Sequence, residues 1–302
     1  MKVTITGATG LLGSRIVAEL QARGDEVTVL SRNPERARQT LRVEAHPWDP
    51  EDEEAPAAAL AGRDGVVHLL GENVAQRWSD DARRRIASSR EVGTRNLIAG
   101  LRAAQPRPAV LVSASASGIY GPHGDEPVTE EDPPAGDFLG EVCQLWEAEA
   151  RAAADLGMRV ALMRTGIVLD RNGGALGQML LPFRLGLGGP IAGGRHYMPW
   201  IAAADVAAMY LAALDGEEWS GPINVTAPEP VTNREFSRAL GRALHRPAIA
   251  PIPGLTLKLL YGEMAQIILT GVRAMPTRAQ ALGYSFKHPQ LDDALREALN
   301  KR

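Results

Sequence analysis

Three glycines near the start of the chain, Gly7, Gly10 and Gly13, have the spacing that binds the pyrophosphate of a dinucleotide. In this motif the first glycine allows a tight turn, the second leaves room for the phosphates, and the third lets helix and strand pack closely. The helix that follows presents free backbone N–H groups and its positive dipole end to the phosphates. A glycine-rich turn without a ligand is the alternative, but the flanking strand and helix signals favour a dinucleotide site. The residues predicted to surround the pyrophosphate are Gly7, Thr9, Gly10, Leu11, Leu12 and Gly13.

The end of the second predicted strand, residues 26–30, indicates which dinucleotide binds. An enzyme that uses NAD(H) places an Asp or Glu about 20 residues after the glycines to hold the ribose 2′-hydroxyl. This chain has Ser31 and Arg32 there. A hydroxyl and a guanidinium favour a 2′-phosphate, which a carboxylate would repel. The sequence therefore predicts NADP(H) in preference to NAD(H), although Arg32 alone also fits a solvated loop arginine.

Other candidate contacts follow the predicted strands at their carboxyl ends, where ligands bind in open parallel sheets. The cofactor contacts expected there are Leu69, Leu70, Gly71, Glu72, Ala114, Thr165 and Val168. Arg195 and His196 lie in a later glycine-rich stretch and are candidate substrate contacts. Arg195 suits either an anionic group of a substrate or plain solvation. His196 has a suitable pKa for proton transfer, but the sequence identifies no carboxylate partner for it.

Strand and helix signals alternate over the first two-thirds of the chain, which predicts an α/β fold with a doubly wound parallel sheet. Strands are expected near residues 3–6, 26–30, 41–46, 66–71, 108–115 and 158–166, and helices near residues 11–24, 33–40, 80–104 and 138–156. The segment 121–137 is rich in Pro, Gly and acidic residues and is expected to form a loop that acts as a lid. We expect a dinucleotide-binding domain over residues 1–220, in which residues 170–198 contribute to the substrate cleft. A smaller C-terminal substrate lobe is expected over residues 221–302.

The amino-acid composition of the chain indicates which kinds of ligand and binding partner to expect. The 302 residues include 33 basic and 36 acidic side chains, so no basic surface for a nucleic acid or a membrane is expected. A single cysteine, Cys143, cannot form an intramolecular disulfide and fits a packed thiol better than a nucleophile. The six histidines are scattered without ligand spacing, so no metal site is expected. The chain opens directly into a strand and holds no long apolar run, which predicts a cytoplasmic protein with a small-molecule substrate.

Several longer motifs resemble those of a known protein family. They are TGATGLLG at 6–13, VLSRNP at 29–34, SSREVGTRNL at 88–97, SASASGIYG at 113–121, RTGIVL at 164–169, LPFRLGLGGPIAGG at 181–194 and NVTAPEPVTNREF at 224–236. Over essentially its full length the chain resembles the extended short-chain dehydrogenase/reductases. Within them it is similar to the epimerase-family branch, labelled nucleoside-diphosphate-sugar epimerase-like, which has its own C-terminal domain. The resemblance implies a Rossmann fold and a nicotinamide cofactor, but no particular substrate.

The resemblance also implies roles for two charged residues. Asp49 matches a position that accepts a hydrogen bond from the adenine amino group, although it also fits a turn residue before Pro50. Arg90 matches a recurring position on the helix behind the fourth strand, from which it would approach the phosphates. A surface salt bridge explains Arg90 nearly as well.

The usual catalytic residues of this family are missing. Extended members pair a strand-end Ser or Thr with a Tyr-x-x-x-Lys motif, in which the lysine lowers the pKa of the tyrosine for proton exchange. Here Leu139 and Cys143 occupy the tyrosine and lysine positions, and neither can do this work. Ser115 and Tyr120 are the remaining candidate catalytic residues. Ser115 alternatively satisfies backbone groups of a loop, and Tyr120, with a pKa near ~10, alternatively packs under the predicted lid.

Two functions remain open from the sequence. One is an NADP(H)-dependent oxidoreductase or epimerase that acts on an unidentified small polar molecule. The other is a catalytically silent NADP(H)-binding protein with a regulatory or redox-sensing role. The missing tyrosine–lysine pair favours the second function, whereas the glycine-rich cleft and the predicted lid favour the first.

Overall fold

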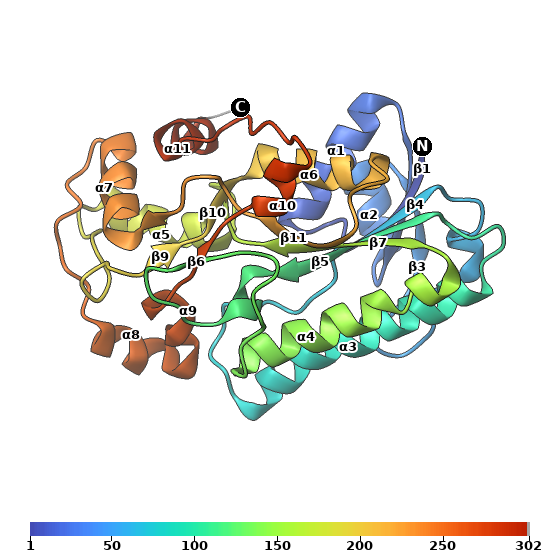
Figure 1. Ribbon diagram of the computed structural model, residues 1–302, viewed down its shortest axis with the longest axis horizontal. Helices are drawn as coiled ribbons and strands as arrows, with labels where there is room; N and C mark the ends of the chain where they lie inside the picture. The colour runs from blue at the N-terminus through green and yellow to red at the C-terminus, as the bar shows by residue number, and fades with distance from the viewer. Residues whose placement is uncertain (301–302) are drawn as a thin grey trace.

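The computed structural model describes residues 1–300 and is built on one parallel sheet of seven strands (Figure 1). The strands lie in the order β11-β7-β5-β4-β1-β2-β3. Every neighbouring pair in this sheet is parallel. The strands are β1 Lys2–Thr6, β2 Glu26–Ser31, β3 Glu44–Pro47, β4 Gly65–His68, β5 Val110–Ala116, β7 Arg159–Thr165 and β11 Gly221–Val225. The order reverses between β1 and β4, so the fold is the doubly wound Rossmann type that the sequence predicted.

Helices cover both faces of the sheet, which explains why its strands are continuous apolar runs. One layer holds α1 (Leu11–Arg23), α2 (Pro34–Leu41) and α6 (Ala203–Asp215), and the other holds α3 (Asp80–Ala103) and α4 (Phe138–Arg151). Successive strand residues face opposite layers. In β4, Val67 packs in the core with α1 and α6, whereas its neighbour Val66 packs in the core with α3 and α4.

A smaller lobe packs beside the carboxyl edge of the sheet and has a core of its own. Trp200, Phe236 and Leu295 are buried together there. The helices of this region are α5 Gly174–Arg184, α7 Asn233–Leu244, α8 Gly254–Tyr261, α9 Ala265–Leu269, α10 Thr277–Ala281 and α11 Leu291–Leu299. Three two-stranded sheets pair β8 (Ile167–Leu169) with β10 (Trp200–Ala202), β9 (Tyr197–Met198) with β12 (Val231–Thr232), and β6 (Pro127–Val128) with β13 (Arg273–Ala274). The short 3₁₀ segments are Ala57–Ala59, Ser117–Tyr120, Ala154–Leu156 and Gly262–Met264.

In the last third of the chain, one strand differs from expectation and one helix has a defined start. Residues 221–225, which we expected in the smaller lobe, form β11 and extend the main sheet beyond β7. Thr232 is the N-cap of α7 and makes a capping box with Glu235.

Asp205, in the first turn of α6, contacts the C-terminal part of the chain. Its buried carboxylate accepts hydrogen bonds from the backbone N–H groups of Lys287 and His288, at 2.7 and 3.0 Å. It also accepts one from the Tyr284 hydroxyl at 3.0 Å. Asp205 therefore attaches the C-terminal segment to the sheet domain.

His68, at the end of β4, is fully buried between two threonines. Its Nδ1 lies 2.8 Å from the Thr6 hydroxyl and its Nε2 lies 3.0 Å from the Thr94 hydroxyl. Burial lowers the pKa of His68 from 6.5 to about 3. The native protein therefore keeps this ring neutral at a pH where the unfolded chain would protonate it.

We expect this difference to make the protein less stable in mild acid. Below pH 6.5 the unfolded chain binds a proton at His68 that the native state does not, so the free energy of unfolding falls as the pH falls. Between pH 7 and pH 5 the loss from this residue is about 2 kcal/mol. Urea unfolding of the wild type and of His68→Gln at both pH values measures it. The variant should lose less stability by that amount, and equal losses would contradict the prediction.

Candidate functional site

The glycine-rich turn between β1 and α1 has the geometry that the motif predicts. Gly7 has φ +70°, and a Cβ added there would lie 2.9 Å from the carbonyl carbon of Leu69. A Cβ on Gly13 would lie 2.3 Å from the Gly7 oxygen, so helix and strand could not pack as they do. Gly10 donates its N–H to the Gly7 oxygen at 3.1 Å and is itself exposed. The turn therefore leaves an open approach at Gly10.

The start of α1 is suited to an anion. Gly10 is the N-cap, no side chain caps the helix, and its first turn contains no acidic residue. Thr9 is exposed, and Leu11 and Leu12 are half-buried, so the first turn can be reached from solvent. Free N–H groups at a helix N-terminus bind phosphate without further help from side chains. The residues present fit the pyrophosphate of a dinucleotide.

The end of β2 carries the two residues on which cofactor choice depends. Ser31 is half-buried, and its hydroxyl oxygen accepts a hydrogen bond from the Asn33 N–H at 3.1 Å. Arg32 is exposed, and its guanidinium has no hydrogen bond or ion pair with any of residues 1–300. Asp49 holds a turn: one of its carboxylate oxygens accepts the Glu51 N–H at 3.3 Å. That contact is the turn role considered above for Asp49, and Arg32 is an exposed cation directly after β2.

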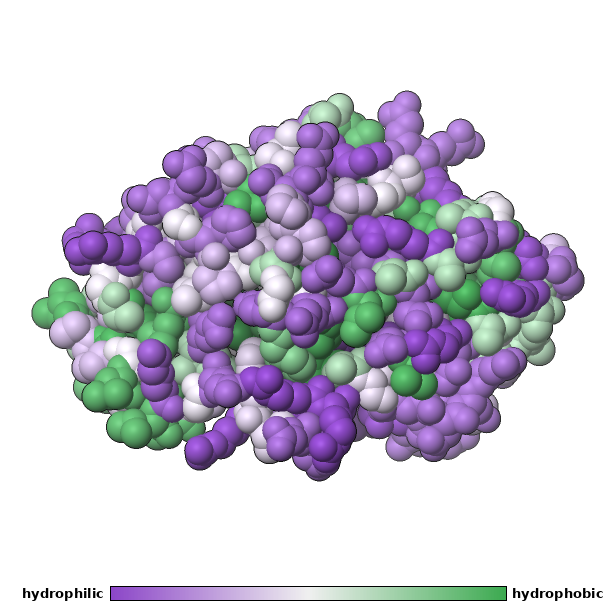
Figure 2. All heavy atoms as spheres, turned by 60° about the horizontal axis from the view of Figure 1, so that its bottom comes forward, coloured by the Kyte–Doolittle hydropathy of each residue, from purple (hydrophilic) through white to green (hydrophobic). Residues whose placement is uncertain are grey.

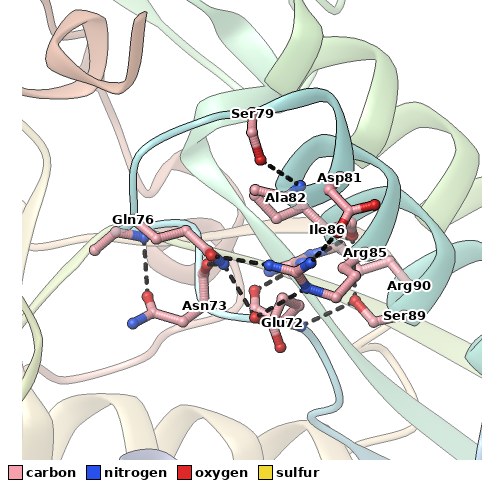
Figure 3. A network of polar contacts seen from close by, with 11 residues as sticks. Glu72, Asn73, Gln76, Ser79, Asp81, Ala82, Arg85, Ile86, Ser89 and Arg90 are labelled. Atoms are coloured by element: carbon pink, nitrogen blue, oxygen red, sulfur yellow. Dashed lines mark hydrogen bonds and ion pairs between the residues drawn. The ribbon is translucent and has the colours of Figure 1, made fainter. Parts of the chain in front are cut away.

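The loop after β4 is held by α3, as Figure 3 shows. Leu69 and Leu70 are half-buried and Gly71 is exposed. Arg90 donates to the carbonyl oxygen of Glu72 at 3.0 Å, and its guanidinium lies 5.0 Å from the ring of Trp146. Arg90 therefore holds the loop in place through these contacts and does not form the surface salt bridge that we considered. Burial lowers the pKa of this guanidinium.

Ser115 is buried at the end of β5 and faces α4. Ala114, its neighbour in β5, is half-buried, whereas Ser115 is only 3% exposed. Its hydroxyl donates to a carboxylate oxygen of Glu147 at 2.7 Å. Glu147 also forms a two-point ion pair with Arg164, at 2.8 and 3.0 Å. The polar partners that Ser115 has in the structure are thus inside the protein.

Tyr120 belongs to the same buried network. Its hydroxyl donates to the Asn224 side-chain oxygen at 2.7 Å and accepts from Arg164 at 2.9 Å. Burial raises the pKa of Tyr120 to about 12, above the value near ~10 that we expected. Neither Ser115 nor Tyr120 is among the residues that line the adjoining cavity.

That cavity has a volume of about 1260 Å³ and lies where the sheet domain meets the smaller lobe. On the sheet side it is lined by Ser117 and Gly118 after β5, Leu139 at the start of α4, and Ile167 in β8. Thr165 and Val168, two of the predicted cofactor contacts, are half-buried beside Ile167. The opposite wall comes from α5, the 191–199 segment and residues 254–272.

The two positions of the missing catalytic pair have different surroundings. Leu139 lines the cavity, so an apolar side chain stands where a tyrosine would meet the substrate. Cys143 is buried behind it, and burial raises the pKa of its thiol to about 12. The thiol stays protonated at neutral pH and packs with Ile119 and Val272, as the sequence indicated.

The structure separates the two predicted substrate contacts. His196 is half-buried and lines the cavity, whereas Arg195 is exposed and does not. Burial lowers the pKa of His196 below its ordinary value of 6.5, so its imidazole is neutral at pH 7. The cavity therefore contains a neutral imidazole.

One wall of the cavity is built from side-chain contacts that the sequence did not predict. Trp78 and Phe138 meet edge to face with ring centroids 5.0 Å apart, and the Arg83 guanidinium lies over both rings. Arg83 forms an ion pair with Glu263, which connects α3 to the α8–α9 region. Gln266 donates to the side chain of Asp137 at 3.3 Å across the same boundary. Side-chain pairing between regions far apart in the chain leaves no local sequence signal.

Comparison with known proteins identifies the family of this chain. Residues 3–225 match the NAD dependent epimerase/dehydratase family, and residues 252–298 match a domain of unknown function, DUF1731. The chain belongs to the NAD-dependent epimerase/dehydratase family. Within this family it is 37% identical over 303 residues to the human epimerase family protein SDR39U1, covering 98% of this chain and 99% of the human one. The chloroplastic SDR39U1 homolog of Arabidopsis thaliana is 38% identical over 299 residues, covering 98% of this chain and 86% of that protein.

A solved structure of the family gives the same fold. The crystal structure of human SDR39U1 (isoform2) with NADPH matches this epimerase-family chain with a TM-score of 0.90 and 35% identity, over 100% of both chains. Among the described residues, no helix is both long and apolar enough to span a bilayer.

Proposed function

We propose that this epimerase-family protein is an NADP(H)-dependent oxidoreductase that acts on a carbonyl or hydroxyl carbon of a small molecule. One observation carries the proposal: the cavity begins at Ser117 and Ile167, which follow the carboxyl ends of β5 and β7. Ligands of open α/β sheets bind at that edge, so a dinucleotide held at Gly10 would extend toward the cavity. When bound, the cofactor supplies or accepts the hydride.

The choice of NADP(H) rests on Ser31 and Arg32. An exposed guanidinium without an internal partner is suited to a 2′-phosphate, and no acidic residue stands between β2 and α2 to repel it. The NADPH in the human SDR39U1 structure supports the same choice.

Proton exchange with the substrate oxygen is assigned to His196, and a hydrogen bond to that oxygen is assigned to Ser117. Both line the cavity, whereas the expected candidates Ser115 and Tyr120 are held in the buried network around Arg164. A half-buried imidazole that is neutral at pH 7 can accept a proton from a hydroxyl or, once protonated, return one to an oxygen.

The second function, a catalytically silent NADP(H) sensor, has one observation in its favour. Leu139 and the protonated Cys143 occupy the usual acid–base positions, and neither side chain can exchange a proton with a substrate at neutral pH. The two functions differ in turnover and not in cofactor binding.

Turnover and cofactor binding are separated by the following experiment. Mass spectrometry identifies any dinucleotide released from purified protein, fluorescence titration measures NADPH and NADH binding, and a panel of carbonyl compounds tests NADPH oxidation. We expect His196→Gln to lower the rate about a hundredfold without changing the NADPH dissociation constant. His46→Gln, at the far edge of the sheet, is the matched control and should retain the wild-type rate. Tight NADPH binding without oxidation by any carbonyl compound would favour the sensor.

A further inference from the structure

The chemistry of the substrate can be read from the cavity, provided that the proposed function holds. Most of the lining side chains are apolar, on every wall. Leu139 and Phe138 come from α4, Met179 from α5, and Ile268 and Val272 from the segment that follows α8. Apolar walls stabilise a bound molecule in proportion to the apolar surface that it removes from water. The small polar substrate that we expected from the sequence would gain little from these walls.

The charged side chains of the cavity are few and include as many carboxylates as cations, which does not favour an anionic substrate. Arg83 is neutralised by its ion pair with Glu263. Lys258 is exposed on α8 and forms no ion pair with residues 1–300, and the lining contains one further carboxylate, that of Asp137. Two cations and two carboxylates thus leave the described lining without net charge. The diphosphate of a nucleotide sugar requires several charge-assisted donors, and this lining does not supply them.

The uncharged polar side chains are partly occupied as well. The side-chain oxygen of Asn233 accepts the Ile191 N–H at 2.8 Å, and the Thr270 hydroxyl donates to the Gln266 carbonyl oxygen at 2.7 Å. Ser117 and His196 are the polar groups that the proposed function places at the substrate oxygen. Their number suits a molecule with one carbonyl or hydroxyl on an apolar body.

The apolar lining continues onto the outside of the protein. No residue of α8 is buried, and Leu255, which lines the cavity, is 70% exposed. Leu259, farther along α8, is 72% exposed. Figure 2 shows apolar side chains gathered at the left end of the molecule, the end at which Figure 1 places α8. An apolar molecule that reaches this surface can therefore contact exposed apolar side chains of α8 before it enters the cavity.

We infer that the cavity binds a predominantly apolar substrate, an aliphatic or alicyclic molecule with a single carbonyl or hydroxyl group, and not a nucleotide sugar. Met179 of α5 and Leu255 of α8 determine this specificity, both from the wall that faces the sheet domain. The inference concerns what the cavity binds and can therefore be tested without turnover.

Displacement of a neutral fluorescent probe tests the inference. 1-Aminoanthracene, whose emission rises in apolar surroundings, is bound to the full-length protein and displaced by pentanol, octanol, undecanol or UDP-glucose. We expect each added methylene to tighten binding of the alcohol about three- to fourfold. Met179→Glu should weaken undecanol binding about tenfold or more, because the carboxylate must lose water beside the alkyl chain. Leu255→Glu, at an exposed position that tolerates charge, should weaken it severalfold.

Two controls separate the cavity from the outer surface. Leu181→Glu lies on the same helix as Met179 at a position that is 67% exposed, and Leu259→Glu removes an apolar side chain from the outside of α8. Both should bind undecanol as the wild type does. The inference is overturned if chain length has no effect, if all four variants bind alike, or if UDP-glucose displaces the probe at lower concentration than undecanol. A separate NADPH titration shows whether the proposed function fails on its own, because alcohol binding does not depend on that result.

Discussion

Replacing Arg32 with aspartate should weaken NADPH binding about several hundredfold and leave NADH binding nearly unchanged. A hydrogen bond to a charged group contributes about 1.5–3 kcal/mol, and this variant loses that contact with the 2′-phosphate. The new carboxylate adds a repulsion of about 1 kcal/mol or more at contact distance. NADH has a 2′-hydroxyl that can donate a hydrogen bond to the aspartate carboxylate. The affinity of the variant for NADH should therefore stay the same or rise. Fluorescence titration with both dinucleotides measures the two constants.

Arg42→Asp is the matched control for this charge change. Arg42 is exposed at the other end of α2, where its φ of +55° is a conformation that aspartate tolerates. This control should leave both dissociation constants unchanged. Equal losses of NADPH and NADH binding in Arg32→Asp would remove the reason for choosing NADP(H).

Replacing Glu147 with glutamine should lower the free energy of unfolding by about 3–5 kcal/mol, because a buried guanidinium would lose its counter-charge. Glu147 is 1% exposed and Arg164 is 5% exposed, so water cannot take the place of the carboxylate. Burial by itself lowers the pKa of Arg164, but the hydrogen bonds and charge of Glu147 outweigh burial and raise it. The network that includes Ser115 and Tyr120 depends on the same pair. Urea unfolding at pH 7 measures the change.

Glu149→Gln provides the comparison on the same helix. Its partner Arg95 has a side chain that is 52% exposed, and an exposed pair contributes at most about 1 kcal/mol. If Glu147→Gln lowers the free energy of unfolding as little as Glu149→Gln does, the buried Glu147–Arg164 ion pair does not stabilise the fold to the predicted extent.

The sheet and the phosphate turn could be predicted because their signals are local. Val3 and Ile5 before Gly7, and the periodic helix after it, determine a strand, a turn and a helix within about twenty residues. The residues after β2 were readable for the same reason, since Arg32 needs no partner from elsewhere in the chain to bind a phosphate. The family resemblance extended this prediction to the full chain.

The catalytic side of the site was harder to predict because it depends on faces and on distant partners. Ser115 and Ser117 are two residues apart, yet the strand ends between them and only Ser117 reaches the cavity. No sequence pattern predicts the hydrogen bond between Ser115 and Glu147 or the ion pair between Arg83 and Glu263, because the partners lie far apart in the chain. The apolar residues of α8 look the same in sequence whether they are buried or exposed.

The position of β11 has a consequence for shortened forms of the protein. The chain leaves the sheet after Thr165, builds much of the cavity, and returns at Gly221 to pair with residues 161–165 of β7. A fragment that ends at residue 220 would leave β7 with a free hydrogen-bonding edge rich in apolar residues, which is a template for aggregation. On the ribosome the same edge stays open until residue 225 has emerged. Residues 166–220 must therefore be synthesised before β11 can pair with β7. A soluble dinucleotide-binding fragment would have to extend at least to residue 225.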